Sequence, residues 1–88
     1  MLRFKKVKET DKDKAHTLVY SNNKLLGYYL KDKDTTSIET WFFESKSHLP
    51  YFKCKTQKEV KDILNKMDNG ISVKIQQHFG MSMVYPNE

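Results

Sequence analysis

The sequence is poor in cysteine, glycine, proline and long apolar runs, and each shortage excludes a class of protein. Cys54 is the only cysteine, so no internal disulfide can form. Three glycines and two prolines leave no flexible linker or low-complexity tract. No apolar run approaches the roughly 18 residues of a membrane-spanning helix, and the charged N-terminus lacks the apolar segment of a secretory signal. We therefore expect one domain over residues 1–88, no membrane partner and a cytoplasmic location.

Arginine is also scarce, although the chain is basic. Arg3 is the only arginine among sixteen basic residues, and the formal net charge is +5. Such a charge favours an acidic partner such as RNA or another nucleic acid. Lysine is a point charge suited to phosphates, whereas arginine reads base edges with a planar fork. We therefore expect nucleic-acid binding without strong sequence specificity.

The amino acids with GC-rich codons are rare as a group. Glycine, alanine, proline and arginine together number only seven, which is typical of an AT-rich genome. In composition the chain resembles the small accessory proteins of AT-rich tailed phages, although no aligned motif carries this resemblance. The resemblance implies a protein of the host cytoplasm that acts by binding, often to block or redirect a host enzyme or defence system.

The first half of the chain has the pattern of β-strands separated by polar turns. Residues 2–7, 16–21, 24–31 and 37–45 are rich in β-branched, aromatic or alternating apolar residues. Asn22 and Asn23 tolerate left-handed backbone and predict a two-residue hairpin loop. The alternation in 2–7 slips at Lys6 and Val7, which predicts a bulge at the end of this strand. Short connections favour an antiparallel meander of four strands.

One helix is indicated by three local signals. "TQKE" at 56–59 has the spacing of a capping box, in which Thr56 and Glu59 satisfy each other's backbone amides. An apolar stripe follows at helical spacing, and Gly70 supplies a left-handed stop. These signals predict a helix over about 57–68, with Val60, Ile63, Leu64 and Met67 on its apolar side.

The segment after the helix alternates between apolar and polar residues from 71 to 85. Fifteen residues is long for one strand, so a break near 77–80 is expected, giving two strands or one bent strand. A helix over 72–79 is the lesser alternative. The predicted fold class is α+β, in the order β-β-β-β-α-β with room for one further strand.

Both faces of the predicted sheet carry large rings, because side chains in a strand alternate between faces. One helix covers one face. The other face would curl into a half-barrel, meet the C-terminal strand, meet a ligand, or meet a second copy in a homodimer. The contact rings on it are expected to be Tyr29 and Phe42, or alternatively Tyr28 with Trp41 and Phe43. Ordinary core or cross-strand packing is the simpler explanation for any single ring, but it is weaker for all of them together because one helix is too little cover.

Two segments without acidic residues are the strongest functional signal. A groove of cations interleaved with rings suits phosphates and bases, although a solvated lysine-rich surface is the alternative interpretation. The predicted nucleic-acid-binding residues are Arg3, Lys5, Lys6 and Lys8 in the first segment and Lys46, Tyr51, Lys53, Lys55 and Lys58 in the second.

Catalytic and metal-binding signatures are not evident in the sequence. His16, His48, Cys54 and His78 lack the paired spacings of a zinc site, and no phosphate-binding glycine loop or serine elbow occurs. We expect a non-enzymatic binding protein without cofactor or metal. The alternative function is inhibition or modulation of a host protein, such as a defence or toxin nuclease, by direct contact through the sheet face or edge, with RNA possible in the complex.

Overall fold

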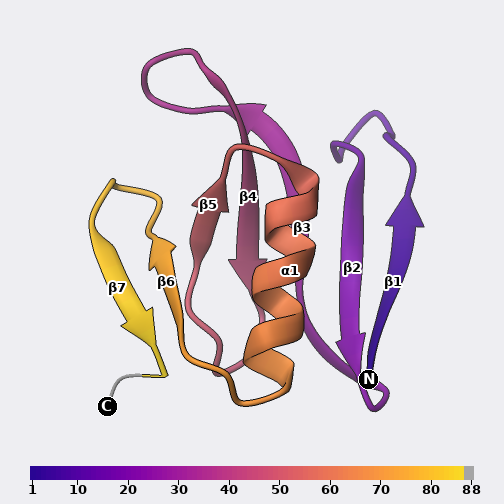
Figure 1. Ribbon diagram of the computed structural model, residues 1–88. Coiled ribbons are helices and arrows are strands. Elements are labelled where there is room, and N and C mark those ends of the chain that lie inside the picture. The colour runs from indigo at the N-terminus through magenta and orange to yellow at the C-terminus, as the bar shows by residue number, and fades with distance from the viewer. Residues whose placement is uncertain (87–88) are drawn as a thin grey trace.

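A computed structural model describes residues 1–86 as one antiparallel sheet of seven strands with a single helix (Figure 1). Neighbouring strands in the sheet follow chain order from β1 to β7. One helix combined with an antiparallel sheet confirms the predicted α+β class. The last two residues of the expected domain, 87 and 88, lie outside the described residues. The elements are β1 (Leu2–Val7), β2 (His16–Ser21), β3 (Lys24–Lys33), β4 (Glu39–Ser45), β5 (Phe52–Cys54), α1 (Gln57–Asp68), β6 (Val73–Gln76) and β7 (Ser82–Tyr85).

The predicted four-strand meander is coarser than the sheet that forms. The less regular segment before the helix contributes the short strand β5, which pairs with β4. The break expected near 77–80 is present, because a turn closed by the Gly80 amide on the Gln77 carbonyl separates β6 from β7. The alternative helix over 72–79 is wrong, since β6 occupies this segment.

The helix begins and ends where its local signals predicted. The Thr56 hydroxyl accepts a hydrogen bond from the Glu59 amide at 3.2 Å, which is one half of the predicted capping box. In place of the other half, the Glu59 carboxylate accepts a hydrogen bond from the Thr56 hydroxyl at 3.3 Å and not from the Thr56 amide. At the other end, Gly70 has φ 72°, its amide donates to the Met67 carbonyl, and the Ile71 amide donates to the Lys66 carbonyl. These two bonds form a Schellman motif, which satisfies carbonyls that the end of a helix leaves unpaired.

The β1–β2 and β2–β3 pairings place the bulge in an unexpected position. The β1–β2 register is continuous from Leu2 to Val7, so the bulge predicted at the end of the first strand is wrong. The irregularity lies in β3, where Val19 pairs with Gly27 and Tyr20 pairs with Leu25, leaving Leu26 as the extra residue. The predicted Asn22–Asn23 loop joins these strands with both residues at positive φ.

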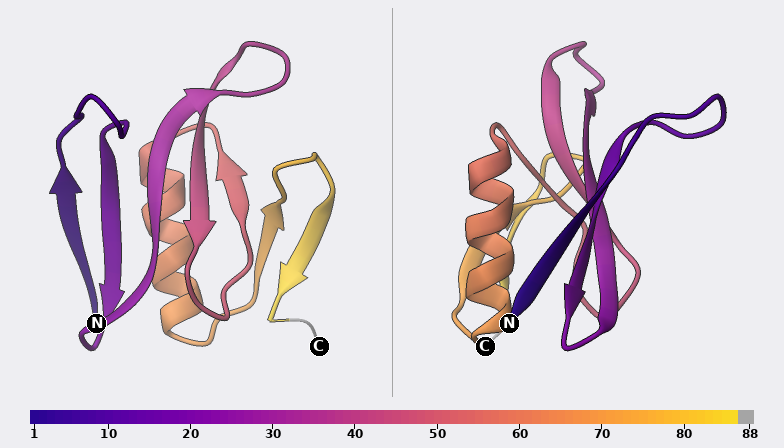
Figure 2. Two further views of the ribbon diagram at one scale, coloured as in Figure 1. Left: turned by 180° about the vertical axis from the view of Figure 1, so that it is seen from behind. Right: turned by 90° about the vertical axis from the view of Figure 1, so that its right-hand side faces the viewer.

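The helix packs on one face of the sheet and, among residues 1–86, no element covers the other face (Figure 2, right). Val60 and Leu64 of α1 are fully buried. Gly27 allows close packing in this layer, because a Cβ atom there would collide with the Glu44 carbonyl oxygen and the Phe43 ring. The sheet side of the core comprises Val19, Leu26, Tyr29, Phe43, Phe52, Cys54, Val73 and Ile75.

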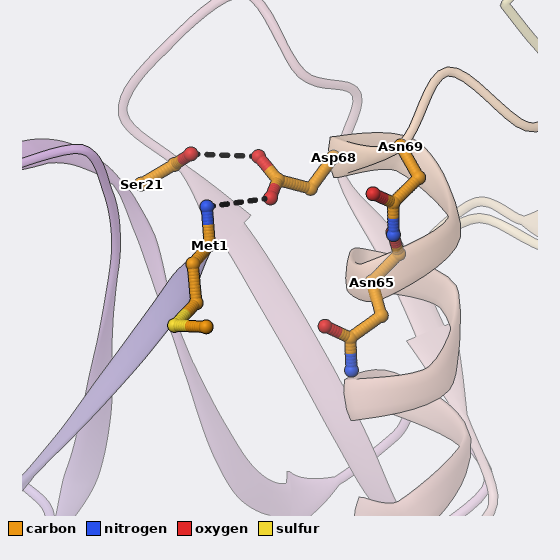
Figure 3. A network of polar contacts seen from close by, with 5 residues as sticks. All are labelled: Met1, Ser21, Asn65, Asp68 and Asn69. Atoms are coloured by element: carbon orange, nitrogen blue, oxygen red, sulfur yellow. Dashed lines mark hydrogen bonds and ion pairs between the residues drawn. The ribbon is translucent and has the colours of Figure 1, made fainter.

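Polar contacts tie the C-terminal end of α1 to the first two strands (Figure 3). The Ser21 hydroxyl donates to the Asp68 carboxylate at 2.6 Å, and the Met1 ammonium lies 3.4 Å from the other carboxylate oxygen. On the helix itself, the Asn69 side chain donates to the Asn65 carbonyl at 2.8 Å. These contacts help to fix the position of the helix across the sheet.

No helix in the described part of the chain is long and apolar enough to cross a membrane.

Candidate functional site

The face of the sheet opposite α1, called the open face below, brings together rings and cations from six strands or their ends. The cross-strand register runs from Lys5 to Leu18 to Tyr28, and separately from Leu30 to Phe42 to Lys53. Alternation in β6 adds Lys74, because its neighbours Val73 and Ile75 are buried on the helix side. The open face is defined by the rings Tyr20, Tyr28, Phe42 and Tyr51 and by the cations Arg3, Lys5, Lys46, Lys53 and Lys74.

Cations of the open face lie directly against its rings. The Arg3 guanidinium is 4.9 Å from the centre of the Tyr20 ring. The Lys46 ammonium is 5.8 Å from the centre of the Tyr28 ring, which also meets the edge of His16 at 5.3 Å. Attraction between a cation and a ring face holds each pair in place. Each of these two cations lies over its ring, so aromatic and positively charged groups are adjacent on this surface.

His78 organises a second group of rings on the same face. Its imidazole meets Phe42 edge to face at 5.0 Å and Tyr51 at 5.6 Å. Its Nε2 lies 3.2 Å from the Phe52 carbonyl oxygen, and its Nδ1 lies 3.7 Å from the Glu44 carboxylate. Because β5 and β6 share a single residue pair in the sheet, His78 adds a side-chain connection between the β6–β7 hairpin and the β4–β5 strands.

The charge of the open face is predominantly positive. Its five cations face two strand carboxylates, Asp32, which is paired with Lys14, and Glu44, which lies 3.7 Å from the His78 imidazole. A third carboxylate, Asp34, follows β3, and its pKa is lowered mainly by the hydrogen bond from the Thr36 hydroxyl, with a smaller contribution from the charge of Lys53. The hydrogen bond from Lys14 is the main cause that lowers the pKa of Asp32, so this carboxylate is ionised and compensated at neutral pH. By contrast, α1 carries three lysines and three acids, so its outer surface has no net charge.

The structure gathers some of the sequence-predicted residues on the open face and disperses others. Lys6 projects from the helix side of β1, Lys8 lies in the turn after β1 and Lys58 lies on α1. Lys55, which follows β5, lines a hollow together with Lys53. Tyr51 is 47% exposed. The predicted residues that share the open face are Arg3, Lys5, Lys46, Lys53, Tyr51 and Phe42.

The prediction that Tyr29 lies with Phe42 as a contact residue on the open face is wrong. The Tyr29 side chain is 1% exposed under α1, where its hydroxyl donates to the Gln57 side chain at 3.1 Å. Burial raises the pKa of this hydroxyl. The ring beside Leu18 on the open face is Tyr28, from the alternative set, while Trp41 and Phe43 of that set lie on the helix side. The two sets are mixed because the β3–β4 register pairs Tyr29 with Phe43 and Leu30 with Phe42, so that Tyr28 shares a face with Phe42 and not with Trp41 or Phe43.

Tyr20 and Lys74 also lie on the open face, and the sequence reasoning did not select them. Lys74 is one of the polar residues of the alternating segment 71–85. Once β6 is known to be a strand, this pattern places Lys74 on the face opposite the buried residues. Tyr20 stood in a β-rich segment, but only the pairing with Arg3 shows which face it takes.

The remaining reactive side chain is not arranged for chemistry. Cys54 is buried on the helix side, and burial, with a smaller contribution from the Glu59 charge, raises the pKa of its thiol to about 12. The thiol is therefore protonated at neutral pH and is a poor nucleophile. Within residues 1–86, no group of three or more His, Cys, Asp or Glu side chains is placed to hold a metal ion.

Comparison of the chain with models of known protein families, with curated proteins and with solved structures found no match.

Proposed function

We propose that this protein is a non-enzymatic module that binds single-stranded nucleic acid, RNA in particular, across the open face of its sheet. The observation that carries the proposal is the interleaving of four rings with five cations on a sheet surface that no described element covers. Bases stack on aromatic rings, and phosphates are neutralised by nearby cations, so this surface has both kinds of contact in one plane. Double-stranded DNA is a poorer fit, because α1 is short and its outer surface carries no net charge.

Salt dependence is the first test of this proposal. Each phosphate contact releases counterions, and for single strands the slope of log affinity against log salt is about −0.7 per contact. If all five cations of the open face contact phosphates, the slope is about −3.5, a loss of roughly a hundredfold between 50 and 200 mM salt. Fluorescence anisotropy with labelled oligonucleotides of different sequence measures it, and similar affinities are expected for all of them. No complex at low salt would contradict the proposal.

A matched pair of variants locates the binding surface. Lys46→Gln with Lys53→Gln removes two cations of the open face, whereas Lys58→Gln with Lys66→Gln removes two from the helix and leaves the same net charge. The first variant is expected to reduce the slope by about 1.4 and the second to leave it unchanged. Equal effects of the two variants would mean that binding is a general consequence of net charge.

A second candidate function is contact with another protein by strand addition at β7. The two free edges of the sheet differ: β1 carries Arg3, Lys5 and Lys6, whereas β7 carries no charged residue. Charged side chains protect an edge strand from pairing with other chains, and β7 lacks that protection. Exposed Phe79 and Met81, at 71% and 64%, lie next to this edge.

The same edge suits a second copy of this chain or a host protein that the chain would inhibit. Native mass spectrometry identifies a homodimer, and a pull-down with and without RNase distinguishes direct protein partners from partners held by RNA. Val84→Lys places a charge on the edge and is expected to abolish strand addition, while Lys74→Gln on the neighbouring strand serves as the control. Retention of the partner by the Val84→Lys variant would exclude this edge.

A further inference from the structure

A groove opens on the helix side of the sheet where the β1–β2 hairpin separates from β3. The β2–β3 pairing ends at Thr17 and Tyr29, while β3 continues beside β4 to Lys33. The divergence leaves a groove of about 710 Å³, called the fork groove below. This volume is within the range of roughly 300–1,000 Å³ that is typical of small-molecule sites. The residues that define the fork groove are Lys6, Lys8, Lys14, Thr17, Lys31 and Trp41.

The fork groove has an aromatic wall suited to a planar ring. Trp41 is partly exposed in it and meets Tyr29 edge to face, with ring centres 5.8 Å apart and planes at 66°. Tyr29 itself is buried, so Trp41 offers the accessible ring surface. Thr17 and Gln57 add polar side chains to the lining. A heterocyclic base could stack on Trp41 while its polar edge meets these groups.

The charge around the fork groove selects for an anion. Four lysines line it against one acid, Glu9. Lys14 is paired with Asp32 at 2.7 Å and Lys31 with Glu39 at 3.0 Å. Lys6 and Lys8 form no ion pair with any residue in 1–86, so their charges are the ones available to a ligand. A flat aromatic surface beside uncompensated cations fits a molecule that combines a base with a phosphate.

We infer that the fork groove binds a nucleoside 5′-phosphate, with the base against Trp41 and the phosphate at Lys6 and Lys8. This site is on the opposite side of the sheet from the open face, so it does not depend on the proposed function. A hollow that touches Tyr28 adjoins the groove through Lys14, His16 and Leu30, so the ligand could be a free nucleotide or the first nucleotide of a bound strand.

Trp41 allows a direct test, because it is the only tryptophan. Adenosine 5′-monophosphate is expected to change its fluorescence with saturation, together with the amide chemical shifts of Thr17 and Gln57. Adenosine should bind at least about fivefold more weakly, since it lacks the contacts with the lysines. Inorganic phosphate should leave the fluorescence unchanged. A short RNA with and without a 5′-phosphate distinguishes a strand end from a free nucleotide as the source.

Variants on both sides of the sheet decide the assignment. Lys6→Gln with Lys8→Gln is expected to weaken adenosine 5′-monophosphate binding by about fivefold to tenfold, and Lys74→Gln on the open face should not change it. The inference is overturned if neither the nucleotide nor 5′-phosphorylated RNA alters the two signals, or if adenosine binds equally well. It is also overturned if phosphate competes as strongly as the nucleotide, or if Lys74→Gln weakens binding as much as the groove variant. Binding of RNA that lacks a 5′-phosphate, measured by anisotropy, reports on the open face separately, so the two proposals can fail independently.

Discussion

The helix-covered face and the open face of the sheet both carry aromatic rings, but they hold them in different surroundings. On the covered face, Phe43 is fully buried and stacks on Phe52 with ring centres 5.1 Å apart. On the open face its neighbour Phe42 remains partly exposed, with Lys53 as its cross-strand partner and His78 against its edge. Similar residues one position apart therefore have different physical environments, and substitutions on the two faces should affect different measurements.

The largest effect is expected from truncating the buried ring of that pair. Phe43→Ala removes a fully buried side chain and leaves a cavity, at a cost of about 3–5 kcal/mol in the free energy of unfolding. Phe42→Ala should cost about 1 kcal/mol, because its side chain is partly hydrated in the folded state. Urea denaturation followed by Trp41 fluorescence measures both. Equal losses would show that the open face is packed in solution as tightly as the covered face.

Gly27→Ala should produce the next largest effect, because the added methyl group would collide with the Glu44 carbonyl and the Phe43 ring. Overpacking of this kind costs about 1–3 kcal/mol. Gly80→Ala is a useful comparison, since Gly80 has φ 95° but open space around its Cβ position, so it tests backbone strain alone. A Gly27→Ala variant as stable as the wild type would indicate that β3 and β4 are less closely packed at Gly27 than these contacts imply.

Thr56→Ala tests the stability of α1, because Thr56 is the N-cap of the helix that packs on one face of the sheet. Loss of the bond from the Glu59 amide should reduce the free energy of unfolding by about 1 kcal/mol. Thr35→Ala, in the exposed turn after β3, is the control and should have little effect. Thermal or urea denaturation measures the difference, and RNA binding by the folded Thr56→Ala variant should remain at the wild-type level.

The smallest effect on stability is expected from Lys74→Gln. This variant also tests whether the nucleic-acid contact extends as far as β6. The Lys74 side chain is exposed, so the free energy of unfolding should change by less than about 0.5 kcal/mol. If the open face extends to β6, the salt slope of RNA binding should fall by about 0.7. Lys58→Gln on α1 should leave this slope unchanged. An unchanged slope for Lys74→Gln would restrict the nucleic-acid contact to the strands before the helix.

Individual elements were predictable to the extent that their signals were local. The Thr56 cap and the Gly70 stop bounded the helix, and the alternation after it identified β6 and β7. The strand β5 was not identified, because three residues in an irregular segment give too short a pattern. Gly27 beside Leu26 was a usable but unexploited indication of the bulge, since an isolated glycine in a strand often accompanies one.

The sequence predicted the chemistry of the candidate site but not which residues share it. Lysine excess and interleaved rings indicated a phosphate-binding surface, and several of the selected cations share one face. Tyr29 was misplaced because the register between β3 and β4 was unknown, and the structure pairs Tyr29 with Phe43, so Phe42 lies on the other face. Lys6 and Lys58 were selected by their neighbours in sequence, yet they lie on the opposite side of the sheet from Lys53.

The sequence by itself determined the helix from Gln57 to Asp68, the Asn22–Asn23 loop and the positive charge, because these depend on interactions within a few residues or on composition alone. Only the tertiary structure decided which rings α1 covers and which cations meet on the open face. The physical reason is that face and register are set by pairing between distant segments and by the extra residue Leu26. No local pattern around a single strand contains that information.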